Sequence, residues 1–164
     1  MTTPLLLSDF TEDADISSWS VVDDGVMGGK SKGNFSLNDT GMGVFKGMVS
    51  LENNGGFSSV RYRFKTQEMA SFSCFVIRLK GDGKLYQFRA KSTIRDSHSY
   101  IAPIPTNGAW QTIEIPLNTM YPAFRGNTLP ILNYKGEILE EIAFLIGNKK
   151  AAAFCLEIDH IELR

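Results

Sequence analysis

The stretch FVIRLKGDGKLYQFRAK, residues 75–91, decides the fold class of this chain. Apolar side chains recur at every second position over 75–80 and again over 85–91, which is the period of a strand that buries one face. Asp82-Gly83 stands between the two runs. An Asp-Gly pair in that position is typical of a tight hairpin turn, because the turn needs positive φ. The stretch therefore predicts a β-hairpin that pairs 75–80 with 85–91.

The same period recurs along the rest of the 164 residues. It predicts further strands over 33–37, 44–51, 57–64, 110–115, 141–146 and 154–163. The segment 66–71 could form a helical turn. No segment keeps a 3.6-residue period, so βαβ units are not expected. Short strands joined by glycine-rich turns favour an all-β sandwich or barrel. Without a linker or repeat, residues 1–164 are interpreted as one domain, and 92–108 and 121–136 as long loops that could carry function.

Composition narrows the classes of function. The chain carries 17 basic and 18 acidic residues, which argues against a nucleic-acid partner. No run approaches the about 18 apolar residues of a membrane span, and the N-terminal MTTPLLLSDF lacks the basic segment of a signal peptide. We therefore expect no membrane insertion and a cytoplasmic location. Cys74 and Cys155 are expected to be reduced and mostly buried, unless their strands lie side by side in a disulfide.

The loop over 23–31 ends in Gly28-Gly29-Lys30-Ser31, like a phosphate-binding loop. Such a loop requires a glycine five positions before the second of these glycines and a helix after it. The chain has Asp24 at that position and a predicted strand after the loop, so nucleotide binding is not expected. A glycine-rich connection that approaches another strand closely and a binding loop of the same geometry both stay open.

No catalytic or metal-binding pattern emerges. His160 belongs to an apolar alternation and is expected at the edge of the core, whereas His98 lies in a polar loop. A G-x-S-x-G elbow is absent from the sequence. Four acidic residues near the N-terminus could suit calcium, although a solvated turn explains them better: Asp9, Glu12, Asp13 and Asp15. We therefore expect no enzyme activity, no metal and no cofactor.

The alternation also gathers arginines opposite the core-facing positions of three successive predicted strands: Arg61, Arg63, Arg78 and Arg89. Like charges on neighbouring strands repel unless carboxylates or a ligand pair with them. The guanidinium fork suits carboxylate, phosphate or sugar oxygens. A salt-bridged outer face and a polar floor that binds a ligand are the two interpretations.

Several stretches match one known family in order and over nearly the whole chain. They are DGVMGGKS (24–31), FKGMVSLENNGGFSSVR (45–61), KGDGKLY (80–86), 110–117, 125–126 and FCLEID (154–159). Through them the chain resembles the complex I intermediate-associated protein family, whose domain is a galactose-binding-like jelly roll. The resemblance implies a sandwich of two antiparallel sheets. The best-known members are mitochondrial and help assemble the membrane arm of NADH:ubiquinone oxidoreductase as chaperones, without a catalytic role. This chain departs from them in its missing transit-peptide pattern, and in Ala151-Ala152-Ala153 where glycine is expected.

Together these observations predict a non-enzymatic jelly-roll protein that acts as an assembly factor or interaction module on a protein partner. The rim of its site is predicted to contain Asp24, Met27, Gly28, Gly29 and Ser31. The floor is predicted to contain Arg61, Tyr86 and Arg89. The alternative is a carbohydrate-binding module for a small carbohydrate, with aromatic platforms drawn from Tyr86, Tyr100 and Trp110, although each of these could belong to the core.

Overall fold

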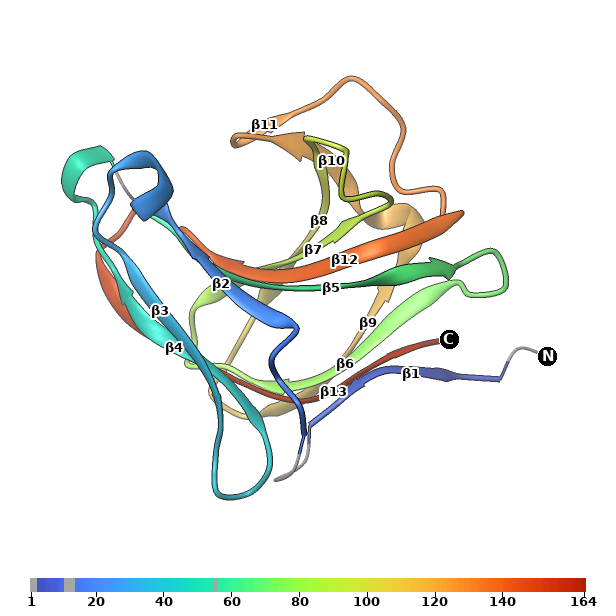
Figure 1. The fold of residues 1–164 in the computed structure, drawn as a ribbon, viewed down its shortest axis with the longest axis horizontal. Helices are drawn as coiled ribbons and strands as arrows, with labels where there is room; N and C mark the ends of the chain where they lie inside the picture. Colours follow the sequence, from blue (N-terminus) through green and yellow to red (C-terminus); the bar gives the residue numbers. More distant parts are fainter. Residues whose placement is uncertain (1–2, 11–13, 55) are drawn as a thin grey trace.

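The strands assemble into two antiparallel sheets packed face to face (Figure 1), which is the predicted all-β jelly-roll sandwich. The computed structural model describes residues 3–10, 14–54 and 56–164, without the side chains of Val26, Met27 and Asn54. In the described residues, no helix is long and apolar enough to cross a membrane.

The six-stranded sheet contains β1 (Leu5–Asp9), β3 (Lys32–Leu37), β4 (Gly43–Val49), β6 (Cys74–Lys80), β9 (Trp110–Pro116) and β13 (Ala152–Leu163). The seven-stranded sheet contains β2 (Trp19–Asp23), β5 (Ser58–Glu68), β7 (Leu85–Lys91), β8 (Ser99–Pro105), β10 (Tyr121–Phe124), β11 (Asn127–Thr128) and β12 (Ile138–Ile146). Three short 3-10 turns connect them: η1 (Asp24–Met27), η2 (Glu52–Asn54) and η3 (Leu117–Thr119).

The last two strands are inserted into the middle of the sheets. The order of the six-stranded sheet is β3-β4-β13-β6-β9, with β1 also on β13, and that of the other is β11-β10-β8-β7-β12-β5-β2. Thus β12 joins β5 to β7, and β13 joins β4 to β6. This arrangement decides which outward residues become neighbours.

Aromatic rings fill the space between the sheets. The ring of Phe88 lies 4.8 Å from that of Phe75 in the opposite sheet and 5.3 Å from that of Phe144. All three side chains are fully buried. At the β2–β3 side, Trp19 stacks at 5.0 Å on both Phe35 and Tyr62 and closes the sandwich there. These contacts stabilise the fold through burial of apolar area and offset ring packing.

The predicted hairpin over 75–91 is wrong, because β6 and β7 lie in different sheets. Gly83 does have a positive φ of 86°, so the local turn chemistry is present. The apolar faces of the two strands cover each other across the core, whereas a hairpin would place them side by side in one layer. The segment 81–84 is therefore a crossover between the sheets.

Two predicted loops contain strands. The segment 92–108 includes β8, and 121–136 includes β10 and β11. These strands were not predicted from the sequence because they contain proline, which is uncommon in strands away from a sheet edge. The prolines are Pro103, Pro105 and Pro122. The predicted helical turn over 66–71 is also wrong at its start, because β5 continues to Glu68, which pairs with Ile138.

His160 does not face the core as its alternation indicated. The pairing of β13 with β6 shifts between Ile158 and His160, and such a bulge exchanges the two faces of a strand. Ile161 is consequently buried, while His160 is half-buried and its Nδ1 lies 3.0 Å from Asp159 Oδ2.

The two cysteines are free thiols. Cys74 is half-buried, but Cys155 is exposed on the outer face of β13, so the expectation that both are mostly buried is wrong for Cys155. It sits one position after the core-facing Phe154, which places it on the opposite face of the strand.

Candidate functional site

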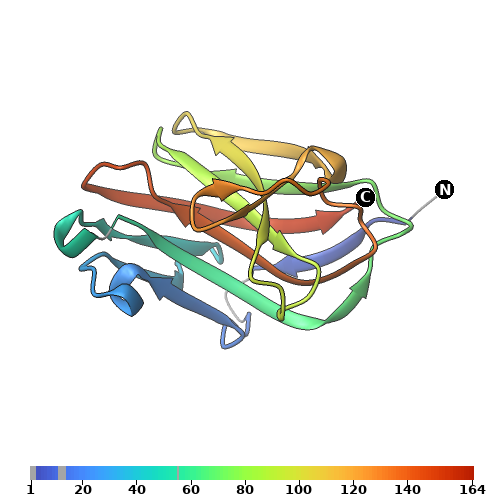
Figure 2. The ribbon, with the colours of Figure 1, turned by 90° about the horizontal axis from the view of Figure 1, so that it is seen from above.

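The outer face of the seven-stranded sheet carries one continuous row of paired residues across six strands. The row, which we call the outer row, consists of Ser20, Arg61, Ala143, Arg89, Ile101 and Tyr121. The long strands β12 and β5 bow so that both of their ends rise above the middle, which makes this face concave along the strands (Figure 1). Figure 2, seen from above, shows the loop with η1 beside the edge strand β2.

Arg61 and Arg89 lie on either side of Ala143 in the outer row, and both are half-buried. Arg89 donates from Nε and Nη2 to Gln87 Oε1, at 3.0 and 2.8 Å. Arg61 Nε is buried and has no hydrogen-bond acceptor among the described residues. Burial lowers the pKa of the Arg89 guanidinium from its ordinary value, and the charges of Tyr121 and Glu141 oppose that shift; an arginine nevertheless stays protonated.

A third arginine on this face, Arg63, has a carboxylate partner. Arg63 Nε donates to Glu141 Oε1 at 2.7 Å, and the Glu141 side chain is 7% exposed. Neither Arg61 nor Arg89 forms an ion pair within the part of the chain that the structure describes. Two of these three arginines therefore lack an anionic partner among the described residues.

Arg78 does not belong to this face, contrary to the expected set of four. It lies on β6 in the other sheet, with Nε 3.7 Å from Asp159 Oδ2 and its guanidinium 5.2 Å from the Trp110 ring. The failed hairpin explains the separation, because β6 and β7 are not neighbours.

Tyr86 is not part of the floor either. It is fully buried on the core face of β7, whereas Arg89, three positions later, points to the outer face. Its hydroxyl donates to Asp82 Oδ1 at 2.9 Å. Burial raises the pKa of Tyr86 far above its ordinary value, so the hydroxyl keeps its proton and acts as a donor.

Asp24 is a fully buried carboxylate that ties three segments together. It accepts hydrogen bonds from the backbone N–H groups of Ser31, Gly56 and Phe57 at 2.9, 2.6 and 3.2 Å, and from the Ser31 hydroxyl at 2.5 Å. Ser31 is buried as well, and its Oγ accepts from Ser50 N at 2.9 Å. Both residues were predicted at the rim of a site, but their polar atoms are engaged inside the protein.

The two rim glycines, Gly28 and Gly29, meet different structural requirements. Gly28 has a φ of 89°, which favours glycine. A Cβ on Gly29 would lie 2.5 Å from Asp24 Cγ, so this glycine allows the loop to close over the carboxylate. The loop continues into β3, as predicted, with no helix. The Met27 side chain, like Glu12 and Asp13 of the acidic cluster, lies outside the described residues.

The aromatic residues considered as sugar platforms do not share a surface. Tyr86 is in the core. Tyr100 packs against Tyr134 and His98, with ring centroids 5.1 and 5.2 Å apart. Trp110 lies under Arg78 on the other sheet. The aromatic ring of the outer row is Tyr121, which was predicted to be part of a loop.

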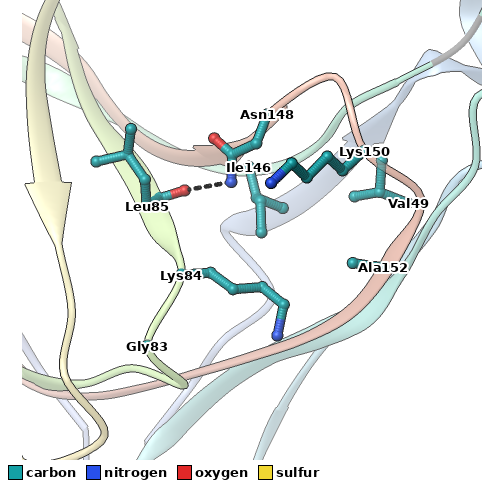
Figure 3. A pocket seen from close by; sticks show the side chains of 8 residues that line it. All are labelled: Val49, Gly83, Lys84, Leu85, Ile146, Asn148, Lys150 and Ala152. Carbon is teal, nitrogen blue, oxygen red and sulfur yellow. Dashed lines mark hydrogen bonds between the residues drawn. The ribbon is translucent and has the colours of Figure 1, made fainter.

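A pocket of about 540 Å³ opens at one end of the sandwich, where 83–85 and 146–152 approach each other (Figure 3). Val49, Leu85 and Ile146 give it apolar walls. Lys84 and Lys150 extend their ammonium groups into it from opposite sides. Asn148 Nδ2 donates to Leu85 O at 3.0 Å, as drawn. No residue of the outer row lines this pocket.

Three residues of the outer face were not predicted to belong to the site. Ala143 separates the arginines, Gln87 accepts from Arg89, and Tyr121 ends the outer row. The alternation of β12 and β7 could place Ala143 and Gln87 on outward faces. Gln87 and Arg89 are two positions apart on β7, whereas only the pairing of β12 with both β5 and β7 places Ala143 between the arginines, and a single sequence gives no signal for that pairing.

Comparison with known proteins identifies relatives of the chain. A family model described as Complex I intermediate-associated protein 30 (CIA30) matches residues 8–158. No curated protein matches the chain significantly in sequence.

Solved structures share the architecture. The family 11 carbohydrate-binding module of the cellulosomal cellulase Lic26A-Cel5E of Clostridium thermocellum superposes with a TM-score of 0.71 at 19% identity, covering 99% of this chain and 95% of the module. The same type of module from that organism, in complex with a β-1,3-1,4-mixed-linked tetrasaccharide, gives 0.67 at 18% identity, covering 98% and 94%. A point mutant of the family 29 carbohydrate-binding module CBM29-2 gives 0.58 at 8% identity, covering 99% and 92%. These likenesses show the fold.

Proposed function

The chain belongs to the complex I intermediate-associated protein 30 family, and from this we propose that it is a non-enzymatic binding protein that acts as an assembly factor. Its partner is a protein, in the first place a subunit or assembly intermediate of NADH:ubiquinone oxidoreductase. The partner binds the concave outer face of the seven-stranded sheet. The observation that carries this proposal is the pair Arg61 and Arg89, which lies on that face without an anionic partner among the described residues.

Side-chain chemistry supports a binding role over a catalytic one. His160 engages Asp159, and His98 packs edge-on against Tyr100. Of the most buried carboxylates among the described residues, Asp24 accepts four structural hydrogen bonds and Glu141 is paired with Arg63. Arginines on a rigid sheet are instead suited to recognition, because their fork is always charged and preorganised.

The test is affinity capture from the native host with the wild-type chain, followed by mass spectrometry. We expect subunits of NADH:ubiquinone oxidoreductase to co-elute with the wild type and to be lost with Arg61→Ala and with Arg89→Ala. Arg95→Ala removes an exposed arginine outside the outer row and should leave capture unchanged. Thermal unfolding must accompany capture, since a strongly destabilised Arg61→Ala would mean that the arginine is structural.

Carbohydrate binding is the second candidate. The mixed-linked tetrasaccharide complex of the family 11 module shows that a protein of this fold can bind a glucan. On this chain the outer row offers guanidinium donors and the ring of Tyr121 for such a ligand. Affinity electrophoresis in gels containing mixed-linked β-glucan tests it: retardation that Tyr121→Ala abolishes would favour a sugar over a protein partner.

A further inference from the structure

We propose that Arg61 and Arg89 together hold one carboxylate, which an acidic side chain of the partner protein places over Ala143. This inference rests on the proposed function of the outer face and names the chemical group that the face recognises. It goes beyond the proposed function because it assigns the charge of the group that binds, its position over Ala143 and the two arginines that contact it.

The three arginines on this sheet face differ in their partners. Arg63 has a carboxylate, Glu141, at 2.7 Å. Arg61 keeps a buried Nε–H with no acceptor among the described residues. A buried donor without a partner is destabilising, and a charged one more so. An anion from outside would satisfy Arg61 as Glu141 satisfies Arg63.

The hydrogen bonds of Arg89 also leave its charge open to an anion. Gln87 Oε1 accepts from both Nε and Nη2 of Arg89, and this edge of a guanidinium is one that carboxylates bind in bidentate fashion. The amide oxygen is neutral, so it satisfies the hydrogen bonds and leaves the charge uncompensated. A carboxylate can replace it or bind at the remaining Nη edge.

The residue between the two arginines is small. Neighbouring strands are about 4.8 Å apart, so two arginines that flank β12 have Cα atoms roughly 10 Å apart. Ala143 contributes only a methyl group to the gap, and it is 7% exposed. Both forks can therefore lean over the same point on the sheet.

The charges around the two arginines favour a monoanion from a protein. Glu141 lies in the adjacent row, paired across the sheet with Arg63 and Lys91, and it disfavours a dianionic phosphate at the same place. Tyr100 and Trp110, the sugar platforms considered from the sequence, lie elsewhere, and Tyr121 of the outer row is two strands away from Arg89. A glutamate or aspartate side chain fits both conditions.

The experiment uses the arginine Nε–H signals of the full chain in NMR spectra, assigned with Arg61→Lys, Arg63→Lys and Arg89→Lys. The probes are doubly blocked glutamate, doubly blocked glutamine as its neutral match, glucuronate and inorganic phosphate, at constant ionic strength. We expect blocked glutamate to shift the Nε–H signals of Arg61 and Arg89 and to leave Arg63 unchanged. Each single Arg61→Lys or Arg89→Lys change should weaken this binding by roughly tenfold.

A second variant supplies the anion from the chain itself. Ala143→Glu should move both Nε–H signals without any probe and abolish the response to blocked glutamate, whereas Ala143→Gln should leave the signals near their free positions. Should both Ala143 variants fail to fold, the titration of the wild-type chain still decides.

The outcomes separate this inference from the proposed function. Equal responses to glutamate and glutamine, no response, or a larger response to glucuronate or phosphate would each overturn the carboxylate site of a protein partner. If capture of the partner still depends on both arginines in that case, the face is the binding face and only the assigned anion is wrong. If glutamate binds as expected but capture is independent of both arginines, the proposed function fails and the carboxylate site remains.

Discussion

Replacing Asp24 by alanine should destabilise the protein far more than an ordinary surface substitution. The carboxylate is fully buried and accepts four hydrogen bonds, two from Ser31 and one each from Gly56 and Phe57. Alanine removes all four acceptor contacts and leaves the donors in place. The substitution therefore removes the carboxylate that connects the loop after β2 with the turn before β5 and the start of β5.

The size of the effect follows from those contacts. A buried donor without an acceptor costs about 1–3 kcal/mol. Gly56 and Phe57 are half-buried, so water can accept part of the hydrogen bonding of their backbone N–H groups. Ser31 is only 3% exposed. We therefore expect Asp24→Ala to lower the free energy of unfolding by about 3–5 kcal/mol, a large share of the about 5–15 kcal/mol typical of a domain.

The effect should depend on pH with a defined sign. Burial raises the pKa of Asp24, but the hydrogen bonds from Ser31, Gly56 and Phe57 outweigh it and hold the pKa below its ordinary value. A carboxyl with a depressed folded pKa stabilises fully above its unfolded pKa of about 3.9, and this contribution is lost as the pH falls through the folded pKa. The difference between wild type and Asp24→Ala should narrow in that acidic range.

Urea unfolding followed by tryptophan fluorescence measures the difference, with Asp39→Ala as control because Asp39 is exposed. The control should change stability by less than about 0.5 kcal/mol. Asp24→Asn keeps the shape of the side chain and removes the charge, so it should fall between alanine and the wild type. A loss below about 1 kcal/mol for Asp24→Ala, or a gap that does not narrow in acid, would refute the anchoring role.

Three further outcomes are expected. Cys155, which is exposed, should react with a bulky thiol reagent without denaturant, and Cys74 should react much more slowly. Burial raises the pKa of Cys155, so the rate of its reaction should keep rising above the pH at which the rate for a free thiol becomes constant. Titration calorimetry with ATP and magnesium should detect no binding at 28–31, and micromolar binding there would contradict this. Gly47→Ala should prevent normal pairing of β3 with β4, because its Cβ would clash with the Lys32 carbonyl oxygen, and hydrogen exchange should then be faster in those two strands than in β7.

Period-2 alternation predicted the strands whose two faces meet different surroundings. Both β5 and β7 were located within a few residues, and the outward direction of Arg61 and Arg89 followed from the same pattern. The prediction succeeded there because a single buried face imposes alternation on the sequence. It failed for β8 and β10, which carry prolines near the sheet edge.

Neighbour relations were much harder to predict than strands. The hairpin over 75–91 was a local inference, and local turn chemistry at Gly83 does not determine whether a turn links strands in one sheet or crosses to the other. Arg61 and Arg89 were expected to be close through consecutive strands, yet β12, from much later in the chain, is what joins them. The role of Asp24 was missed for the same reason, since its partners at 56–57 are distant in sequence.

The insertion of β12 between β5 and β7 also bears on the order of events during folding. Until residues 138–146 have left the ribosome, β5 and β7 have no common neighbour, and the positions of Arg61 and Arg89 relative to each other are undefined. The six-stranded sheet has the same dependence, because β13 joins β4 to β6. A topology so rich in distant pairings folds slowly and leaves unpaired edges exposed meanwhile. The arginine pair therefore forms only once β12 has paired with both β5 and β7, and a partner that recognises the pair would not bind a nascent chain that still lacks β12.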